Sequence, residues 1–160
     1  MDQKLPENIL EKLEKPTDSS CLDGFIRFIR PEELNPLLQK GYEKSGQAIP
    51  FAITAFGDIL TWEKDKYICL VSFAKSTVTI LESGSEFFFE DLNDKDFIAK
   101  YFDYQLFLLA TGKFGKLDID ECFGFIPLLS FGGTEDIQRI QKVKINEYLD
   151  MAIQTAGKIS

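Results

Sequence analysis

The stretch from residue 49 to residue 81 alternates with a period of two, which is the spacing of a β-strand rather than of a helix. Turn residues interrupt it at Gly57-Asp58, within Glu63 to Lys66 and at Lys75-Ser76. Connections this short cannot hold the crossover helices that parallel strands require. The stretch from Ile49 to Leu81 therefore predicts an antiparallel β-meander.

Apolar residues follow helical spacing on either side of this meander. The expected helices run from about Pro6 to Glu14, from an Asn35 cap ahead of Pro36, after a capping box at Ser83 and Glu86, from an Asp94 cap, and over Ile145 to Ile153. Residues 118–131 contain Pro127 and predict a loop or an edge strand. The predicted fold is therefore one α+β domain over residues 1–160. It has an antiparallel sheet, helices packed on one face, and residues 1–24 as a helical lead-in.

The composition excludes several kinds of chemistry. The chain has no histidine, which removes Ser-His-Asp and Cys-His catalysis and histidine zinc sites. Cys21, Cys69 and Cys122 are odd in number and match no metal spacing, so we expect reduced thiols in a cytoplasmic protein. No segment approaches the roughly 20 apolar residues of a membrane span. We expect no cofactor and no metal.

Three partial motifs fail on their context. Gly112-Lys113-Phe114 lacks the glycine spacing and the following Ser or Thr of a phosphate-binding loop. Ser72 and Lys75 match the S-x-x-K pattern of serine acyl transfer but stand at a strand end without companion motifs. Asp91 to Lys95 resembles the start of a calcium loop, but a lysine replaces a ligand and the glycine is missing. The sequence therefore predicts no enzyme activity.

Carboxylates gather in two segments of a chain whose net charge is −8. Such a charge disfavours nucleic acid and anionic membranes as partners and favours a basic protein. One interpretation is that the carboxylates cap helix N-termini, where they favour the helix dipole. The other is a surface that steers a basic partner. The candidate partner-binding residues are Glu82, Glu86, Glu90, Asp91, Asp94 and Asp96 in one cluster and Asp118, Asp120 and Glu121 in the other.

Four segments resemble a family of bacterial immunity proteins. These are residues 28–33 (Phe-Ile-Arg-Pro-Glu-Glu), residues 52–58 with the following Trp62, residues 118–133 with their Phe-Gly-Phe-Ile-Pro block and closing Gly-Gly, and residues 143–149. The family is the Tdi-type C-terminal domain of type VI secretion DNase immunity proteins, often preceded by a GAD-like region. The resemblance implies a fold broadly like that of SUKH-type immunity proteins, no catalysis, and inhibition of a toxin by direct binding.

The motif residues of this resemblance are interpreted as structural. We expect tight turns or positive φ at the glycines, a rigid segment at Pro127, a side-chain turn cap at Asp58, and a core position for Trp62. The glycines are Gly57, Gly124, Gly132 and Gly133.

Three functions compete at this stage. The first is an immunity protein whose acidic surface occludes the basic substrate groove of a nuclease toxin. The second is a general protein-interaction domain of the bacterial cytoplasm. The third is a hydrolase that works with carboxylates alone, which the lack of histidine makes the weakest of the three.

Overall fold

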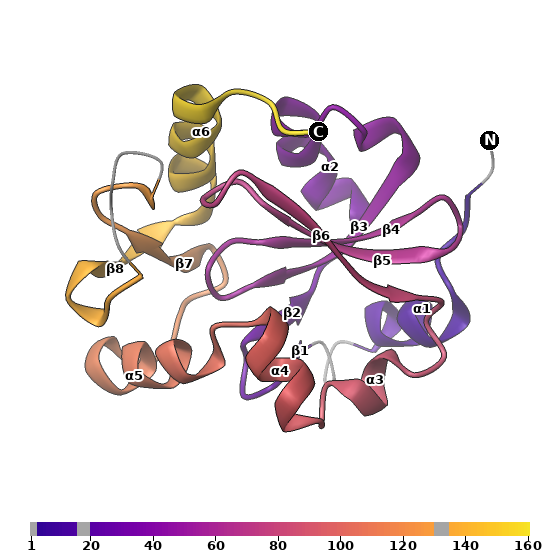
Figure 1. Cartoon of the computed structure of the whole chain (residues 1–160), viewed down its shortest axis with the longest axis horizontal. Coiled ribbons are helices and arrows are strands. Elements are labelled where there is room, and N and C mark those ends of the chain that lie inside the picture. Colours follow the sequence, from indigo (N-terminus) through magenta and orange to yellow (C-terminus); the bar gives the residue numbers. More distant parts are fainter. Residues whose placement is uncertain (1–2, 16–19, 130–134) are drawn as a thin grey trace.

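A six-stranded antiparallel sheet forms the middle layer of the computed structural model, which describes residues 3–15, 20–129 and 135–160 (Figure 1). The strands lie side by side in chain order: β1 (Ser20–Cys21), β2 (Ile26–Phe28), β3 (Ala48–Thr54), β4 (Ile59–Glu63), β5 (Tyr67–Ser72) and β6 (Thr77–Ser83). The predicted α+β class and antiparallel meander are confirmed. The sheet is also wider than expected, because β2 pairs with β3 and brings Ile26 opposite Thr54.

Local chemistry sets the turns of the meander. Lys64 and Asp65 both have positive φ, at +56° and +54°, in the short turn that joins β4 to β5. Paired positive φ values suit the right-handed twist of a tight hairpin. The register between β3 and β4 shifts between Pro50 and Ala52. A bulge is expected there, because proline has no N–H to give to the ladder.

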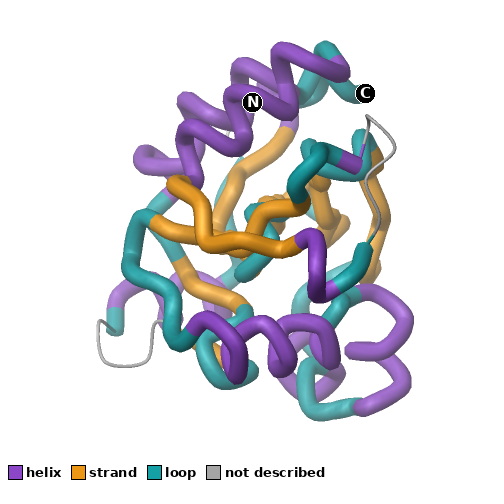
Figure 2. Tube along the Cα trace, turned by 90° about the vertical axis from the view of Figure 1, so that its left-hand side faces the viewer, coloured by secondary structure: helices purple, strands orange, loops and turns teal. Residues whose placement is uncertain are grey.

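The central strands are buried on both faces, and this overturns the expectation that helices pack on one face only. Neighbouring residues of β4, Ile59 and Leu60, enter two different hydrophobic clusters, and so do Leu70 and Val71 of β5. A strand with apolar residues at consecutive positions needs cover on both sides. Helices α2 (Pro31–Gly41) and α6 (Ile145–Ala156) cover one face; α1 (Glu7–Glu14), α3 (Phe88–Asp91), α4 (Lys95–Tyr101) and α5 (Tyr104–Phe114) cover the other (Figures 1 and 2).

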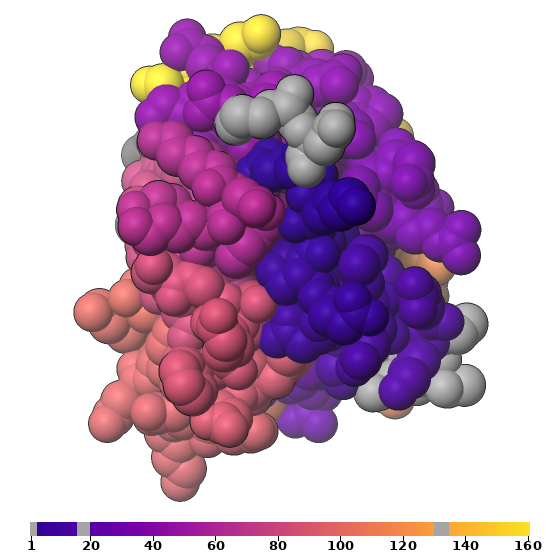
Figure 3. Space-filling model, turned by 90° about the vertical axis from the view of Figure 1, so that its right-hand side faces the viewer, coloured from indigo at the N-terminus to yellow at the C-terminus, as the bar shows by residue number. Residues whose placement is uncertain are grey.

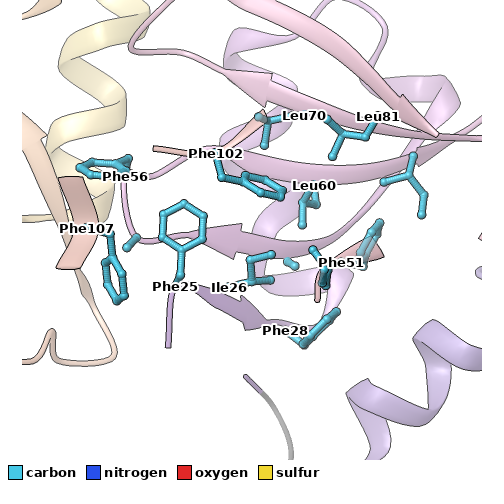
Figure 4. Packing of buried hydrophobic residues seen from close by; sticks show 14 of the residues in the cluster. Phe25, Ile26, Phe28, Phe51, Phe56, Leu60, Leu70, Leu81, Phe102 and Phe107 are labelled. Atoms are coloured by element: carbon cyan, nitrogen blue, oxygen red, sulfur yellow. The ribbon is translucent and has the colours of Figure 1, made fainter. Parts of the chain in front are cut away.

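Phenylalanine rings fill the larger of the two clusters (Figure 4). Phe25 meets Phe56, Phe102 and Phe107 edge-on, with ring centroids 6.1, 5.5 and 5.2 Å away. Each such contact is worth about 0.5–1.5 kcal/mol beyond the area it buries. Phe25 therefore ties the sheet to the start of α5.

Two of the expected helix starts are wrong. Helix α2 begins at Pro31, so Asn35 is not its cap and Pro36 lies inside the helix. Proline is well suited to the first helical position, which makes Pro31 the stronger start signal. No side-chain cap precedes α3, so the Ser83–Glu86 capping box does not form. Asp94 does cap α4, accepting a 2.9 Å hydrogen bond from the Asp96 N–H.

The region after α4 also differs in part from the prediction. The single long helix expected after Asp94 divides into α4 and α5, which are separated by Phe102 and Asp103. Strand β7 (Glu121–Phe125) pairs antiparallel with β8 (Ile140–Lys144), a strand that was not predicted. A 3-10 turn (Ser45–Gln47) leads into β3 and a second one, η4 (Ile137–Arg139), precedes β8. The expected helices at Pro6–Glu14 and Ile145–Ile153 are confirmed by α1 and α6.

Gly124 lies in the middle of β7, and its requirement for glycine is steric rather than conformational. A Cβ at this position would stand 2.8 Å from both Tyr148 Cε1 and Val143 Cγ2. Carbon atoms do not approach one another so closely without a shift of the neighbouring groups. Gly124 therefore lets α6 pack against the β7–β8 hairpin.

We predict that Gly124→Ala lowers the free energy of unfolding by about 1–3 kcal/mol, the usual cost of overpacking. Gly46→Ala is the matched control, because a Cβ there would meet nothing within 4 Å. The control should change stability by less than about 0.5 kcal/mol. Urea unfolding of both variants tests this, and equal stabilities would contradict the steric account.

Candidate partner-binding face

Four carboxylates lie together where β6 ends and α3 begins. We call Glu82, Glu86, Glu90 and Asp91 the acidic face; Glu86 and Glu90 are exposed, whereas Glu82 and Asp91 are half-buried. The N-terminal helix supports this segment from the side, where Asn8 Nδ2 donates a 2.7 Å hydrogen bond to the Ser85 carbonyl. Figure 3 shows the N-terminal segment packed against the chain around α3.

An aromatic residue stands among these carboxylates. Phe87 follows Glu86 directly, precedes α3, and leaves 65% of its surface exposed. The neighbouring Phe88 is fully buried, so the local backbone turns one ring into the core and the next into solvent. Aromatic residues, phenylalanine among them, are enriched at protein–protein interfaces relative to the rest of the surface. The sequence analysis did not single out Phe87, because exposure cannot be read from a run of three phenylalanines.

The carboxylates of the acidic face crowd one another. Burial, a hydrogen bond with Asp91, and the charges of Asp91 and Glu86 together raise the pKa of Glu82 to about 8. The Glu82 Oε2 atom is buried and receives no donor from the described residues. Glu82 therefore keeps its proton near neutral pH and donates it toward Asp91.

No ion pair between described residues neutralises this face. The ion pairs of that part of the chain lie elsewhere, as Lys40–Asp150, Lys75–Asp103, Lys75–Glu135 and Lys144–Asp120. The acidic face is thus a surface of carboxylates that form no ion pair with the residues that the structure describes.

The other predicted site residues have structural roles. Asp94 caps α4 and Asp96 occupies its first turn, as the helix-dipole interpretation requires. Asp120 forms a 2.9 Å ion pair with Lys144, whose hydrogen bond lowers the pKa of Asp120. Glu121 Oε1 accepts a 2.8 Å hydrogen bond from the Asp118 N–H.

Arg27 binds the backbone of the segment that carries this second cluster. Its guanidinium donates to the carbonyls of Asp118, Ile119 and Glu121 at 3.1, 3.2 and 2.8 Å. These bonds fix the loop between α5 and β7 against strand β2. The two acidic clusters predicted from the sequence therefore belong to different parts of the fold, and only the first is free of ion pairs with described residues.

Ser72 and Lys75 lie beside Asp58 at the end of the sheet where β5 finishes and β4 starts. Burial raises the pKa of Asp58 to about 6, although a hydrogen bond with Ser72 and the charge of Lys75 act in the opposite direction. Lys75 Nζ lies 2.9 Å from Asp103 and 3.3 Å from Glu135. Burial lowers the pKa of Lys75, but these carboxylates outweigh it and the net shift is upward. A lysine held in its charged form is unsuited to activate Ser72 as a nucleophile.

The motif residues of the resemblance lie near this group. Gly57 has a φ of +83° in the turn between β3 and β4. A side-chain cap from Asp58 was expected for this turn, and that expectation is wrong. Instead Thr54 Oγ1 accepts hydrogen bonds from the N–H groups of Phe56 and Asp58, and the Asp58 carboxyl faces Ser72 and Lys75.

Two further motif positions, Trp62 and Pro127, can be compared with expectation. Trp62 is 5% exposed and therefore lies in the core, where its Nε1 donates to Asp65 Oδ1 at 3.2 Å. Pro127 follows β7 and is preceded by a cis peptide bond. Gly132 and Gly133 lie outside the described residues.

Within residues 3–15, 20–129 and 135–160, no three acidic or cysteine side chains are grouped so that they could hold a metal ion. None of the helices in those ranges is both long and apolar enough to span a bilayer.

Glu82 is expected to make stability depend on pH. Its pKa is about 8 in the folded protein and near its ordinary 4.5 in the unfolded chain, so the folded state holds the extra proton between these values. Stability is then lost as the pH rises from about 4.5 to about 8. Glu82→Gln cannot ionise, so we predict that it gains melting temperature relative to the native chain between about pH 5 and about pH 8.5. If the difference in melting temperature between Glu82→Gln and the native chain is the same at about pH 5 and about pH 8.5, this account is wrong.

Comparison with solved structures supports the fold. The structure resembles the crystal structure of Atu4351 from Agrobacterium tumefaciens, with a TM-score of 0.62 and 18% identity over 98% of this chain and 83% of that chain. At this identity the likeness establishes the fold alone. The comparison with curated proteins gave no match.

A family model described as "T6SS immunity protein Tdi1, C-terminal" matches residues 82–155. The matched segment begins at Glu82, the first residue of the acidic face, and contains the helices α3 to α6 together with β7 and β8. Residues 82–155 of this chain are therefore similar to the C-terminal region of the type VI secretion immunity protein Tdi1.

Proposed function

We propose that this chain is a non-catalytic immunity protein that binds a toxin of a type VI secretion system and inhibits it, with the acidic face as the contact surface. The observation that carries the proposal is the exposed Phe87 among carboxylates that form no ion pair with described residues. The face lies inside the segment that matches the immunity family.

We further propose that the toxin is a nuclease. An enzyme that cleaves nucleic acid must hold phosphate groups, and it does so with lysine and arginine side chains. A surface of closely spaced carboxylates can occupy such a groove in place of the phosphates. Complementary charge also accelerates encounter between the two proteins. The chain's net charge of −8 acts in the same direction.

The raised pKa of Glu82 supports a binding role for this face. Burial, the hydrogen bond with Asp91 and repulsion by the neighbouring carboxylates together raise the pKa of Glu82 in the free protein. A basic partner would reduce this repulsion and favour the ionised form. An arrangement that is unfavourable in the free chain but favourable in a complex is expected of a binding surface rather than of a merely solvated one.

The environment of Lys75 and the absence of histidine support the non-catalytic part of the proposal. Lys75 is engaged by Asp103 and Glu135 and so cannot serve as a base for Ser72. The chain offers no histidine to replace it. Inhibition then depends on occlusion of the toxin.

The test is association with the toxin, which a pull-down from the native host identifies and which is then prepared in an inactive form. We predict that Glu86→Lys with Glu90→Lys lowers the association rate constant about tenfold or more at low salt. The change leaves Asp94 intact, since its reversal would also remove the cap of α4. Phe87→Ala should instead accelerate dissociation and weaken binding by about 2 kcal/mol, the loss typical of an interface centre.

The control reverses Glu32 and Glu33, which are exposed on α2 on the other side of the sheet. It changes the net charge by the same amount and should leave the association rate within about twofold of the native value. Equal slowing by both double variants would mean that only total charge matters. An unchanged rate in the Glu86/Glu90 variant would exclude the acidic face as the contact.

A further inference from the structure

A cavity of about 620 Å³ lies between the β1–β2 hairpin, helix α5 and the loop that follows α5. Cavities of this size commonly hold small molecules. No residue of the acidic face lines it, so this cavity is separate from the surface proposed to contact the toxin.

Arg27 brings a partly buried positive charge to the wall of this cavity. Its two terminal nitrogens donate to backbone carbonyls of the loop after α5, at 2.8–3.2 Å, and no described carboxylate forms an ion pair with it. Burial lowers the pKa of Arg27, and the nearby charge of Glu121 offsets this effect only in part. Carbonyl groups satisfy the hydrogen bonds of a guanidinium but do not cancel its charge. Arg27 therefore leaves a positive charge at the cavity without a negative partner among the described residues.

Two buried polar groups beside the cavity lack a hydrogen-bond partner. They are the Nε–H of Arg27 and the hydroxyl of Thr111, and neither meets a partner in the part of the chain that the structure describes. Buried polar groups are nearly always hydrogen-bonded, because an unpaired one is unfavourable. Arg27 and Thr111 line the same cavity, so one acceptor seated there could serve both sides of it.

The charged side chains of the lining are Arg27 and Lys116 against Asp23, which leaves one net positive charge. Lys116 is exposed and forms no ion pair with the described residues. The Asp23 carboxylate already accepts a 2.7 Å hydrogen bond from the Tyr104 hydroxyl. This positive site occurs in a chain whose net charge is −8. A ligand with a single negative charge would neutralise it.

Apolar side chains complete the lining. Phe107 comes from α5 and Leu117 from the loop after it. A pocket that is partly apolar and has a few polar groups suits an organic molecule better than a bare inorganic ion.

We propose that this cavity binds a small organic monocarboxylate. The carboxylate lies toward Lys116 and Arg27, and the apolar body rests on Phe107 and Leu117. The Thr111 hydroxyl reaches the carboxylate by rotation of its side chain. Doubly charged phosphate is disfavoured, because its second negative charge exceeds the single positive charge of the lining.

Nuclear magnetic resonance of the whole chain tests this proposal with benzoate as the probe. The chain has only three arginines, so the Nε–H signal of Arg27 is identified by its loss in Arg27→Lys. We expect benzoate, added to about 10 mM, to shift this signal until it levels off. Benzyl alcohol has a similar shape without the charge and should cause no such shift. The proposal is wrong if benzoate gives no saturable shift or if benzyl alcohol binds equally well. Tighter binding of inorganic phosphate than of benzoate would overturn the assignment to a monocarboxylate.

A pair of lysine variants tests the charge. Lys116→Gln should weaken benzoate binding about fivefold or more, because it removes a charged donor from the site. Lys113→Gln is the matched control, since Lys113 is also exposed but does not line the cavity, and it should stay within about twofold of the native affinity. Equal affinities in the two variants would contradict the proposed position of the carboxylate.

Thr111→Val tests the unpaired hydroxyl with nearly unchanged shape. It should weaken benzoate binding about threefold without lowering the melting temperature, because the hydroxyl has no partner to lose in the free chain. Unchanged benzoate affinity in this variant would exclude Thr111 from the site. Toxin binding is measured separately, so failure of this proposal and failure of the proposed function can be told apart.

Discussion

Strands β3, β4 and β5 carry apolar side chains on both of their faces. The rest of the architecture follows from the need to cover both faces. Ile59 and Leu60 are both fully buried although they point to opposite sides of the sheet. Each face must therefore be covered, by α2 and α6 on one side and by α1, α3, α4 and α5 on the other. Because the second layer consists of short helices, its outer surface carries many helix ends, and the acidic face is formed at one of them.

The matched family segment depends on this arrangement. Residues 82–155 contain helices of both layers but only the last residues of β6 from the central sheet. The segment is held to the sheet by buried contacts such as Phe25 with Phe107 and by the ion pair between Lys75 and Asp103. The N-terminal part of the chain thus serves as a scaffold, and α1 positions the Ser85 backbone beside the acidic face.

The two acidic clusters show why charge in a sequence does not by itself locate a binding surface. Asp118, Asp120 and Glu121 are more closely spaced along the chain than Glu86, Glu90 and Asp91. In the structure, however, Asp120 is paired with Lys144 and Glu121 accepts a hydrogen bond from the Asp118 N–H. Arg27 binds the backbone carbonyl of Asp118. Only the contacts made across the fold distinguish a surface that is already satisfied from one that remains available.

Elements that depend on local pattern were predicted from the sequence, and elements that depend on distant partners were not. The meander, α1, α6 and the Asp94 cap follow from periodicity and capping chemistry. Strand β8 was missed because Ile140–Lys144 is polar on its outer side and becomes a strand only by pairing with β7. The division of α4 from α5 at Phe102 and Asp103 likewise reflects distant contacts, since Phe102 packs on Phe25 and Asp103 binds Lys75.

The exposure of Phe87, on which the proposed function depends, is also a property of the fold. Nothing in the run Phe87-Phe88-Phe89 indicates which ring faces solvent, and only the start of α3 decides it. The most direct test is hydrogen–deuterium exchange of the chain with and without its inactive toxin. The account predicts that binding slows exchange between Glu82 and Asp96 while leaving α2 and α6 unchanged. Slower exchange confined to α2 and α6 would contradict it.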